Sequence, residues 1–230
     1  ALDLTDKPFP GRGEYSAQWG KPGLASLGLW FWENGFDLDP IREVERMRDT
    51  NFRAMYGAWD ALKNVDGLYP THRISWAAYI TGKRESRRLM GDVVVTRGDL
   101  YRQKRFEDGC VPCTWHMDLH VPHRDYQAGF EGEEFISWCV IGEYPRPHWL
   151  PYRALYSRNI GNLYMAGRDV SVTHEALGTV RVIRTCGMMG EVIGLAAALC
   201  RELGATPRSL YQKHWDVLQG VLVKGVPARQ

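Results

Sequence analysis

A group of polar residues near the middle of the chain has side chains suited to proton transfer. His116, Asp118 and His120 alternate with other residues, so an extended segment would place all three on one face. A histidine titrates near neutral pH and can act as an acid or a base towards a bound substrate. We therefore take Asp118 and His120 as candidate catalytic residues.

The same group allows two other interpretations. Together with His123, its imidazole and carboxylate groups are suitable ligands for a metal ion, which would make the chain a metal-dependent hydrolase. The residues could also form a hydrogen-bonded loop that takes no part in chemistry. Residue types alone leave these three readings open.

Two cysteines form the motif Cys110-Val-Pro-Cys113. This spacing occurs in zinc knuckles and in redox pairs, but a second C-x-x-C or a thioredoxin-like strand then usually accompanies it. The chain offers neither, which favours two ordinary loop cysteines. The odd total of five cysteines makes a complete disulfide framework unfavourable and favours a reducing, cytoplasmic compartment.

An aromatic cluster lies nearer the start of the chain. Trp30, Phe31 and Trp32 precede Glu33, in a chain that has nine tryptophans. Aromatic rings beside a carboxylate can form a stacking platform for a ring-shaped substrate such as a sugar. Trp30, Trp32 and Glu33 are therefore candidate substrate-binding residues. The alternatives are core packing or, for the chain as a whole, a Trp-rich carbohydrate-binding or interaction module without catalysis.

The last third of the chain predicts a short buried strand over 162–166 that feeds a helix over 180–203, through a turn at 167–169 and a loop at 170–178. The free N–H groups and the dipole at such a helix start favour an anion, either a phosphate or a reduced flavin ring. Three glycines of the helix recur on one face: Gly187, Gly190 and Gly194. They predict close approach of another backbone or of a flat ligand, with tight helix–sheet packing as the simpler explanation.

Other elements follow from apolar periodicity. A helix is expected over 38–64, with Asp39 as its N-cap, and strands are expected over 72–80, 93–96 and 135–141. A last helix begins at Thr206 and runs to about residue 218.

The net charge of +2 argues against a nucleic-acid partner. The most apolar run, Val192–Cys200, is shorter than the roughly 20 residues that span a membrane, so no membrane partner is expected.

The stretch Ile160–Gly190 resembles the C-terminal flavin-binding segment of the bacterial FAD-dependent oxidoreductases, which have a glutathione-reductase-like FAD domain. The resemblance covers about residues 25–205 and includes further segments in the same order: Trp30–Gly35, Arg48-Asp49, Tyr56–Asn64, Gly82–Asp92, Asp118–His120 and Pro151–Arg153.

This resemblance implies FAD as cofactor and a role for the residues around the 167–169 turn. Gly167, Arg168 and Asp169 would form the turn at the ribityl chain and pyrophosphate, and Ser171, Thr173 and His174 would line the loop under the flavin. Arg181 and Val182 would open the helix whose dipole faces the pyrimidine end of the ring. His174 joins His120 as a candidate base.

The resemblance also gives meaning to a charge run, Arg84-Glu85-Ser86-Arg87-Arg88. A solvated loop is the ordinary interpretation of such a run. Its place in a long family motif indicates instead an ion-pair network or a wall near the flavin.

One expected part of the family is missing from these residues. The chain contains no strand–GxGxxG–helix unit and no acidic residue following one for the adenosine ribose. We therefore expect a fragment that binds FAD poorly alone, with the FAD-binding half supplied in cis or by a second chain. The small-molecule substrate is expected to be hydroxylated, with carbohydrate as one possibility.

The expected fold is α/β, with α+β character in the substrate domain and a mixed sheet with flanking helices. It would be the C-terminal part of a two-domain FAD/NAD(P)-binding-type flavoprotein. Residues 1–150 would be a substrate domain, 151–204 a strand–helix segment that returns to the FAD-binding domain, and 205–230 a C-terminal helix.

Overall fold

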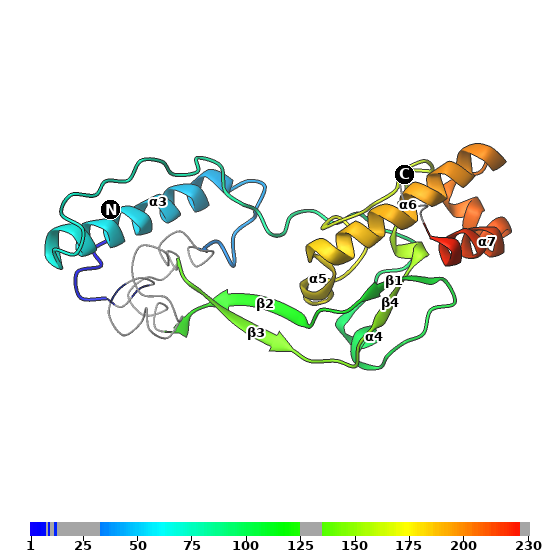
Figure 1. Ribbon diagram of the computed structural model, residues 1–230, viewed down its shortest axis with the longest axis horizontal. Coiled ribbons are helices and arrows are strands. Elements are labelled where there is room, and N and C mark those ends of the chain that lie inside the picture. Colours follow the sequence, from blue (N-terminus) through cyan, green and yellow to red (C-terminus); the bar gives the residue numbers. More distant parts are fainter. Residues whose placement is uncertain (8, 10–11, 13–32, 125–134, 226–230) are drawn as a thin grey trace. The chain divides into compact units, whose positions relative to one another are not determined.

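The structure is a computed structural model that describes residues 1–7, 9, 12, 33–124 and 135–225 (Figure 1). Trp30 and Trp32, two of the predicted substrate residues, lie outside these. The chain divides into two compact units, Ala1–Lys83 with His120–Cys139 and Arg84–Leu119 with Val140–Gln230. We call them unit 1 and unit 2. The assignment of a substrate domain to residues 1–150 stays a prediction.

Unit 1 is built on helix α3, Val44–Asp60, which continues as the π-helical turn η1, Ala61–Val65. The helix starts later than predicted because the Asp39 carboxylate accepts from the backbone N–H of Ile41 at 2.8 Å and so caps a turn that precedes the helix. It packs closely on the chain start: a Cβ on Gly57 would lie 2.0 Å from the carbonyl oxygen of Leu2.

The side of α3 that is buried in unit 1 carries small residues. Ala54, Gly57 and Ala58 are buried there, and the apolar cluster around them is completed by Leu2, Leu4, Phe9, Ala61, Leu62, Phe135 and Ile136. Of the apolar residues that recur along this helix, Met47 and Leu62 are buried, whereas Phe52, Met55, Tyr56 and Trp59 lie outside the buried cluster.

Unit 2 contains a small antiparallel sheet. Strand β1, Gly109–Cys113, pairs with β4, His148–Pro151, and β4 leads into the 3-10 turn η3, Tyr152–Ala154. Asp108, just before β1, is fully buried and accepts two hydrogen bonds from Arg153, from Nε at 2.9 Å and from Nη2 at 2.8 Å. This ion pair connects the two strands. The short helix α4, Arg97–Tyr101, precedes the sheet and has a Thr96 capping box.

A second two-stranded sheet contains β2, Met117–Pro122, and β3, Ser137–Gly142. The predicted strand 135–141 is confirmed as β3. The boundaries between the two units fall within β2 and β3. The predicted strand 72–80 has no ladder partner and is extended chain in unit 1.

Three helices complete unit 2: α5, His174–Val180; α6, Ile183–Leu203; and α7, Pro207–Lys224. Their apolar sides share one core with β1, β4 and η3. The sequence predicted a loop up to residue 178, whereas α5 begins at His174. Gly204 ends α6 in the left-handed conformation (φ 60°), as predicted for a C-cap.

The fold class is therefore mixed α/β, with small antiparallel sheets and several helices. The expected mixed sheet with flanking helices is not formed by the described residues, whose only parallel pairing is a single bridge between Val95 and Val172.

Among the described helices, α6 alone is long and apolar enough to cross a membrane by length and composition. The apolar run Val192–Cys200, from which no membrane segment was expected, covers only part of this 21-residue helix. The same test is passed by core helices of soluble proteins, and α6 buries Met189, Val192 and Ala196 in the core of unit 2.

Candidate functional site

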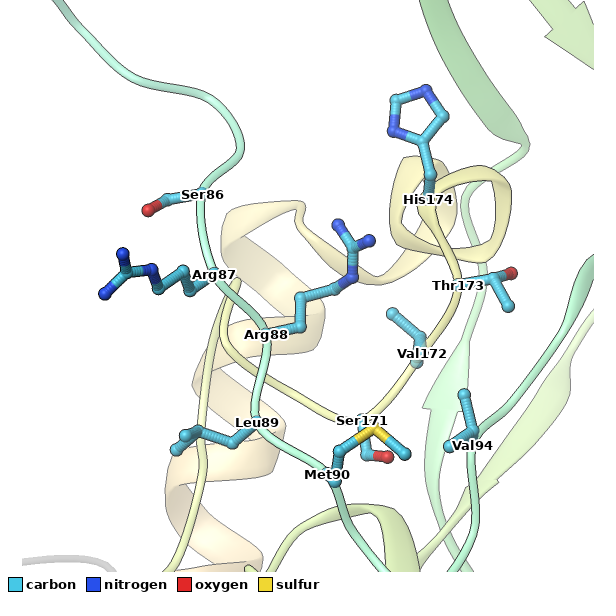
Figure 2. Close-up of a pocket in the computed structure, with 10 residues that line it drawn as sticks. All are labelled: Ser86, Arg87, Arg88, Leu89, Met90, Val94, Ser171, Val172, Thr173 and His174. Atoms are coloured by element: carbon cyan, nitrogen blue, oxygen red, sulfur yellow. The ribbon is translucent and has the colours of Figure 1, made fainter. Parts of the chain in front are cut away.

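A cavity of about 440 Å³ lies in unit 2 between the segment before α4 and the segment that leads into α5 (Figure 2). Its walls are two stretches of chain, 86–90 with Val94 on one side and 171–174 on the other. The residues that line it are Ser86, Arg87, Arg88, Leu89, Met90, Val94, Ser171, Val172, Thr173 and His174. Three residues predicted as site residues, Ser171, Thr173 and His174, are thus brought together here.

Backbone hydrogen bonds hold the two walls together. The N–H of Leu89 donates to the carbonyl of Asp169 at 2.9 Å. Val95 donates to the carbonyl of Ser171 at 3.1 Å and accepts from the N–H of Thr173 at 2.9 Å. This pairing fixes which side chains of the 171–174 segment face the cavity.

Two hydroxyl groups of this segment are buried without a partner. Ser171 Oγ and Thr173 Oγ1 have no hydrogen bond to any described residue, and Ser171 is 1% exposed. Such an atom costs about 1–3 kcal/mol when it is left unsatisfied. Both residues line the cavity, so a bound polar molecule could satisfy them.

His174 lies at the start of α5 and contacts a carboxylate. Its Nδ1 is 2.5 Å from Oε2 of Glu85, and Glu85 also pairs with Arg88. An ionised carboxylate only accepts, so Nδ1 carries the hydrogen and Nε2 keeps its lone pair when the ring is neutral. Partial burial lowers the pKa of His174, and the Arg88 cation adds to this effect. This shift of the pKa favours the neutral, proton-accepting form of His174.

The charge run 84–88 contains an ion pair and contributes to a wall of the cavity, whereas its place near a flavin stays a prediction. Arg88 pairs with Glu85 and also lines the cavity, and burial lowers the pKa of its guanidinium. In Figure 2, Arg88 extends towards the 172–174 segment, whereas Arg87 extends the opposite way. The run is thus an ion-pair network within a wall of the cavity.

The turn at 167–169 lies beside the start of α6. Gly167 has a φ of 134°, a conformation that favours glycine. The charges of Arg168 and Asp169 act in opposite directions on the pKa of Cys186, in the first turn of α6, which is raised mainly by burial. None of these turn residues lines the cavity.

Asp118 is held by an ion pair within unit 2. Arg181, which follows α5, donates from Nη2 to the Asp118 carbonyl at 3.0 Å and to its carboxylate at 3.1 Å. A Cβ on Gly178 would lie 2.9 Å from the backbone N and O of Asp118, so α5 passes this strand closely. Asp118 does not line the cavity, and its catalytic role stays a prediction.

His120 and Glu33 meet in unit 1. The distance from His120 Nδ1 to Glu33 Oε2 is 2.7 Å, and Ser137 Oγ is 3.1 Å from the same nitrogen. Both side chains are largely buried, at 10% and 16% exposure. Because the serine faces the same nitrogen as the carboxylate, the three residues do not have the order of a serine nucleophile and its base. The geometry is that of a buried hydrogen-bonded cluster in which one nitrogen of His120 faces both Glu33 and Ser137.

The C-x-x-C cysteines have the properties of structural residues. Cys113 is fully buried in β1, and burial raises the pKa of its thiol to about 12. Burial raises the pKa of Cys110 further, with nearby Asp108 adding to the effect. Thiolate is the form that binds metal and reacts, so both properties disfavour a zinc or redox role.

The glycine stripe of α6 is open. A Cβ at Gly187, Gly190 or Gly194 would meet no described atom within 4 Å. The close approach predicted from these glycines is therefore not made by the described part of the chain. At the start of the same helix, Val182 is the N-cap and Thr185 Oγ1 is buried without a described partner.

Several cavity residues were missed from the sequence. Leu89, Met90 and Val94 carry no reactive group. The signal that could have found Leu89 and Met90 was their position in the long Gly82–Asp92 motif, whereas Val94 lies in the predicted strand 93–96. Glu85 was noted only as part of a charge run, because its pairing with a residue 89 positions away leaves no local pattern.

Comparison with known proteins bears on the whole chain. Residues 13–222 match the model of a protein family described as FAD dependent oxidoreductase. No curated protein and no solved structure matches the chain. The family match covers most of the sequence, including both walls of the cavity and helix α6, and the chain therefore belongs to the FAD dependent oxidoreductase family.

Proposed function

We propose that this chain forms the flavin-facing C-terminal part of an oxidoreductase that takes a hydride from a small organic substrate. The observation that carries this proposal is the cavity of unit 2. It combines two buried, unpartnered hydroxyls with a neutral histidine held by a carboxylate.

The residues of this region fit a bound FAD. Ser171 Oγ and Thr173 Oγ1 could each exchange hydrogen bonds with polar atoms of the cofactor. The N-terminus of the 21-residue helix α6, with the buried Thr185 Oγ1 in its first turn, favours the negative charge of a reduced ring or a phosphate. When bound, FAD would supply the hydride acceptor.

The proposed base is His174. Its Nε2 would take the proton of a substrate hydroxyl or amine as the hydride leaves the adjacent carbon. Nδ1 would keep its hydrogen and go on donating it to Glu85, and that carboxylate would stabilise the imidazolium that forms. Arg88, on the other side of Glu85, would keep the carboxylate ionised and in place.

FAD binding in this proposal needs a second segment. The 230 residues contain no strand–GxGxxG–helix unit, so we propose that such a unit is supplied in cis or by another chain. The open glycine stripe of α6 has the backbone access that a close-packed partner helix needs. A hydroxylated substrate, with carbohydrate as one possibility, remains part of the proposal.

The test compares flavin content in two preparations. The 230-residue chain alone should purify with little flavin, and the product of its full open reading frame, or a complex with the chain encoded beside it, should carry stoichiometric FAD. The readout is the flavin absorbance of the released cofactor. Tight, stoichiometric flavin in the 230-residue chain alone would refute the need for a second segment. The absence of flavin from both preparations would refute the proposed function.

A further inference from the structure

Unit 1 has a larger cavity, which the proposed function does not use. Its volume is about 670 Å³, within the range of small-molecule sites. One wall is a stripe of α3 and the other is the extended chain that follows it. The lining residues are Arg48, Asn51, Phe52, Met55, Trp59, His72, Arg73, Ile74, Ser75, Trp76, Ala77, Ala78, Ile80, Thr81 and Gly82.

The stripe of α3 is the first observation that points to a ligand. Phe52, Met55 and Trp59 follow one another at helical spacing on a side that is distinct from the buried side with Ala54 and Ala58. Between residues 52 and 59 the helix thus buries small residues, and Phe52, Met55 and Trp59 line the cavity. Apolar packing alone would favour the reverse arrangement, since burial of large side chains gives more stability.

The facing wall is also apolar and is poorly covered. Trp76 is 79% exposed and Ile80 is 82% exposed, in a segment that has no ladder partner among the described residues. Large side chains in such a position lose little conformational freedom on binding a flat ring and can cover both of its faces. The two walls together favour an aromatic ligand.

The polar groups determine the charge of that ligand. The described lining residues include two arginines and a histidine, and none of them is acidic. Arg48 is already balanced by Asp49 at 2.8 Å and lies over the Tyr79 ring. Arg73 makes no ion pair or hydrogen bond with the described residues, so among these residues its positive charge is not balanced. Thr81 Oγ1 is buried there without a described partner and can bond a polar atom of the ligand.

We propose that this cavity binds a small aromatic carboxylate, with its rings against Trp76 and the α3 stripe and the carboxylate at Arg73. A neutral aromatic molecule would leave the positive charge unbalanced. A second copy of this chain is a different occupant of the same apolar walls, and the test below distinguishes it. The proposal goes beyond the oxidoreductase function and does not depend on it.

The test is isothermal titration of the full 230-residue chain with two matched probes, 2-naphthoate and 2-naphthalenemethanol. They share the ring system and differ in charge. We expect one naphthoate per chain, bound about fivefold more tightly than the alcohol, which is the size of an ion pair near the surface. Added salt should remove most of that difference. Equal affinity for the two probes, or no saturable binding of either, would overturn the proposal.

Two variants and two controls locate the site. Arg73→Gln should abolish the preference for the acid. Trp76→Ala should lower the affinity of the chain for both probes about tenfold. Both side chains are exposed, so neither change threatens the fold. The controls are Arg42→Gln, at an 83% exposed arginine, and Tyr56→Ala, on α3 but outside the lining; both should bind as the parent chain does. One outcome would favour a second copy of the chain as the occupant and overturn the proposal: the chain dimerises, Trp76→Ala abolishes the dimer, and naphthoate does not bind.

Discussion

Nδ1 of His174 lies 2.5 Å from a carboxylate oxygen of Glu85, a residue 89 positions earlier in the chain. This contact orients a neutral imidazole at the edge of the unit 2 cavity and connects it through Glu85 to Arg88. The site differs from an ordinary polar surface mainly because of this contact between His174 and Glu85. Three predictions concern this network, and two concern the packing that supports it.

Replacement of Glu85 by Gln should lower the pKa of His174 further. The carboxylate stabilises the imidazolium, and the amide removes that stabilisation while it keeps a hydrogen-bond acceptor for Nδ1. An NMR titration of the His174 ring measures the effect in the 230-residue chain. His148, whose pKa is lowered chiefly by burial, is the internal control and should keep that pKa. An unchanged or raised pKa of His174 would show that the Glu85 contact has no electrostatic effect.

His174→Asn should lower the rate of flavin reduction in the intact enzyme by about 100-fold, because the substrate proton loses its acceptor. Stopped-flow absorbance under anaerobic conditions measures this rate. His72→Asn is the matched control and should leave it unchanged. A near-parental rate in His174→Asn would remove this residue as the base.

The pH dependence of the same rate follows from the direction of the pKa shift. The pKa of His174 is lowered from 6.5, chiefly by burial, and only the neutral ring accepts a proton. Flavin reduction should therefore rise with pH on the acid side and reach half its maximum below pH 6.5. A half-maximal rate well above this pH would mean that the rate depends on another group.

Gly178→Ala should destabilise the chain. Its new Cβ would lie 2.9 Å from backbone atoms of Asp118, and backbone cannot move aside as a side-chain end can. We expect a loss of about 1–3 kcal/mol in the free energy of unfolding, measured by chemical denaturation. Gly187→Ala is the control in α6, where the Cβ meets no described atom; it should be neutral or stabilise by up to about 1 kcal/mol. Equal effects of the two changes would contradict the tight packing of α5.

Asp92→Asn should reduce stability above pH 4 and leave it nearly unchanged in acid. Arg208 first, and Tyr156 by its hydrogen bond, hold the pKa of Asp92 below its usual 3.8. A carboxyl with a lowered folded-state pKa stabilises the fold above its unfolded pKa, and this stabilisation disappears as the pH falls through the folded value. The expected loss is about 1 kcal/mol, since Arg208 is partly exposed. The exposed Asp216→Asn on α7 is the control. Equal pH profiles for Asp92→Asn and the parent would contradict the ion pair.

The sequence predicted best those features that rest on local chemistry. The Gly204 cap, the helix that begins with Thr206-Pro207 and the strand over 135–141 are confirmed, because capping residues and apolar alternation act over a few residues. The apolar spacing predicted a helix here but not which of its sides is buried. Between residues 52 and 59 the helix buries small residues against the chain start, an arrangement that depends on tertiary packing.

The site could be predicted only in part. The family segment placed Ser171, Thr173 and His174 together, and the structure has all three in one cavity. The pairing of Glu85 with His174, and that of Glu33 with His120, joins residues almost 90 positions apart. Such contacts depend on tertiary packing and leave no pattern in the sequence. Trp30 and Trp32 lie outside the described residues, so their role as a substrate platform stays a prediction.

The central claim is that the 171–174 cavity of unit 2 holds part of FAD. The most direct measurement is the flavin content of the protein expressed from its full open reading frame, with and without the double change Ser171→Ala and Thr173→Val. We predict one FAD per chain in the parent. In the variant FAD should bind about tenfold more weakly, since two hydrogen bonds are lost, and should therefore be partly lost during purification. Ser75→Ala, a change in unit 1, should retain the parental content. Equal FAD in the double variant and the parent would contradict the claim.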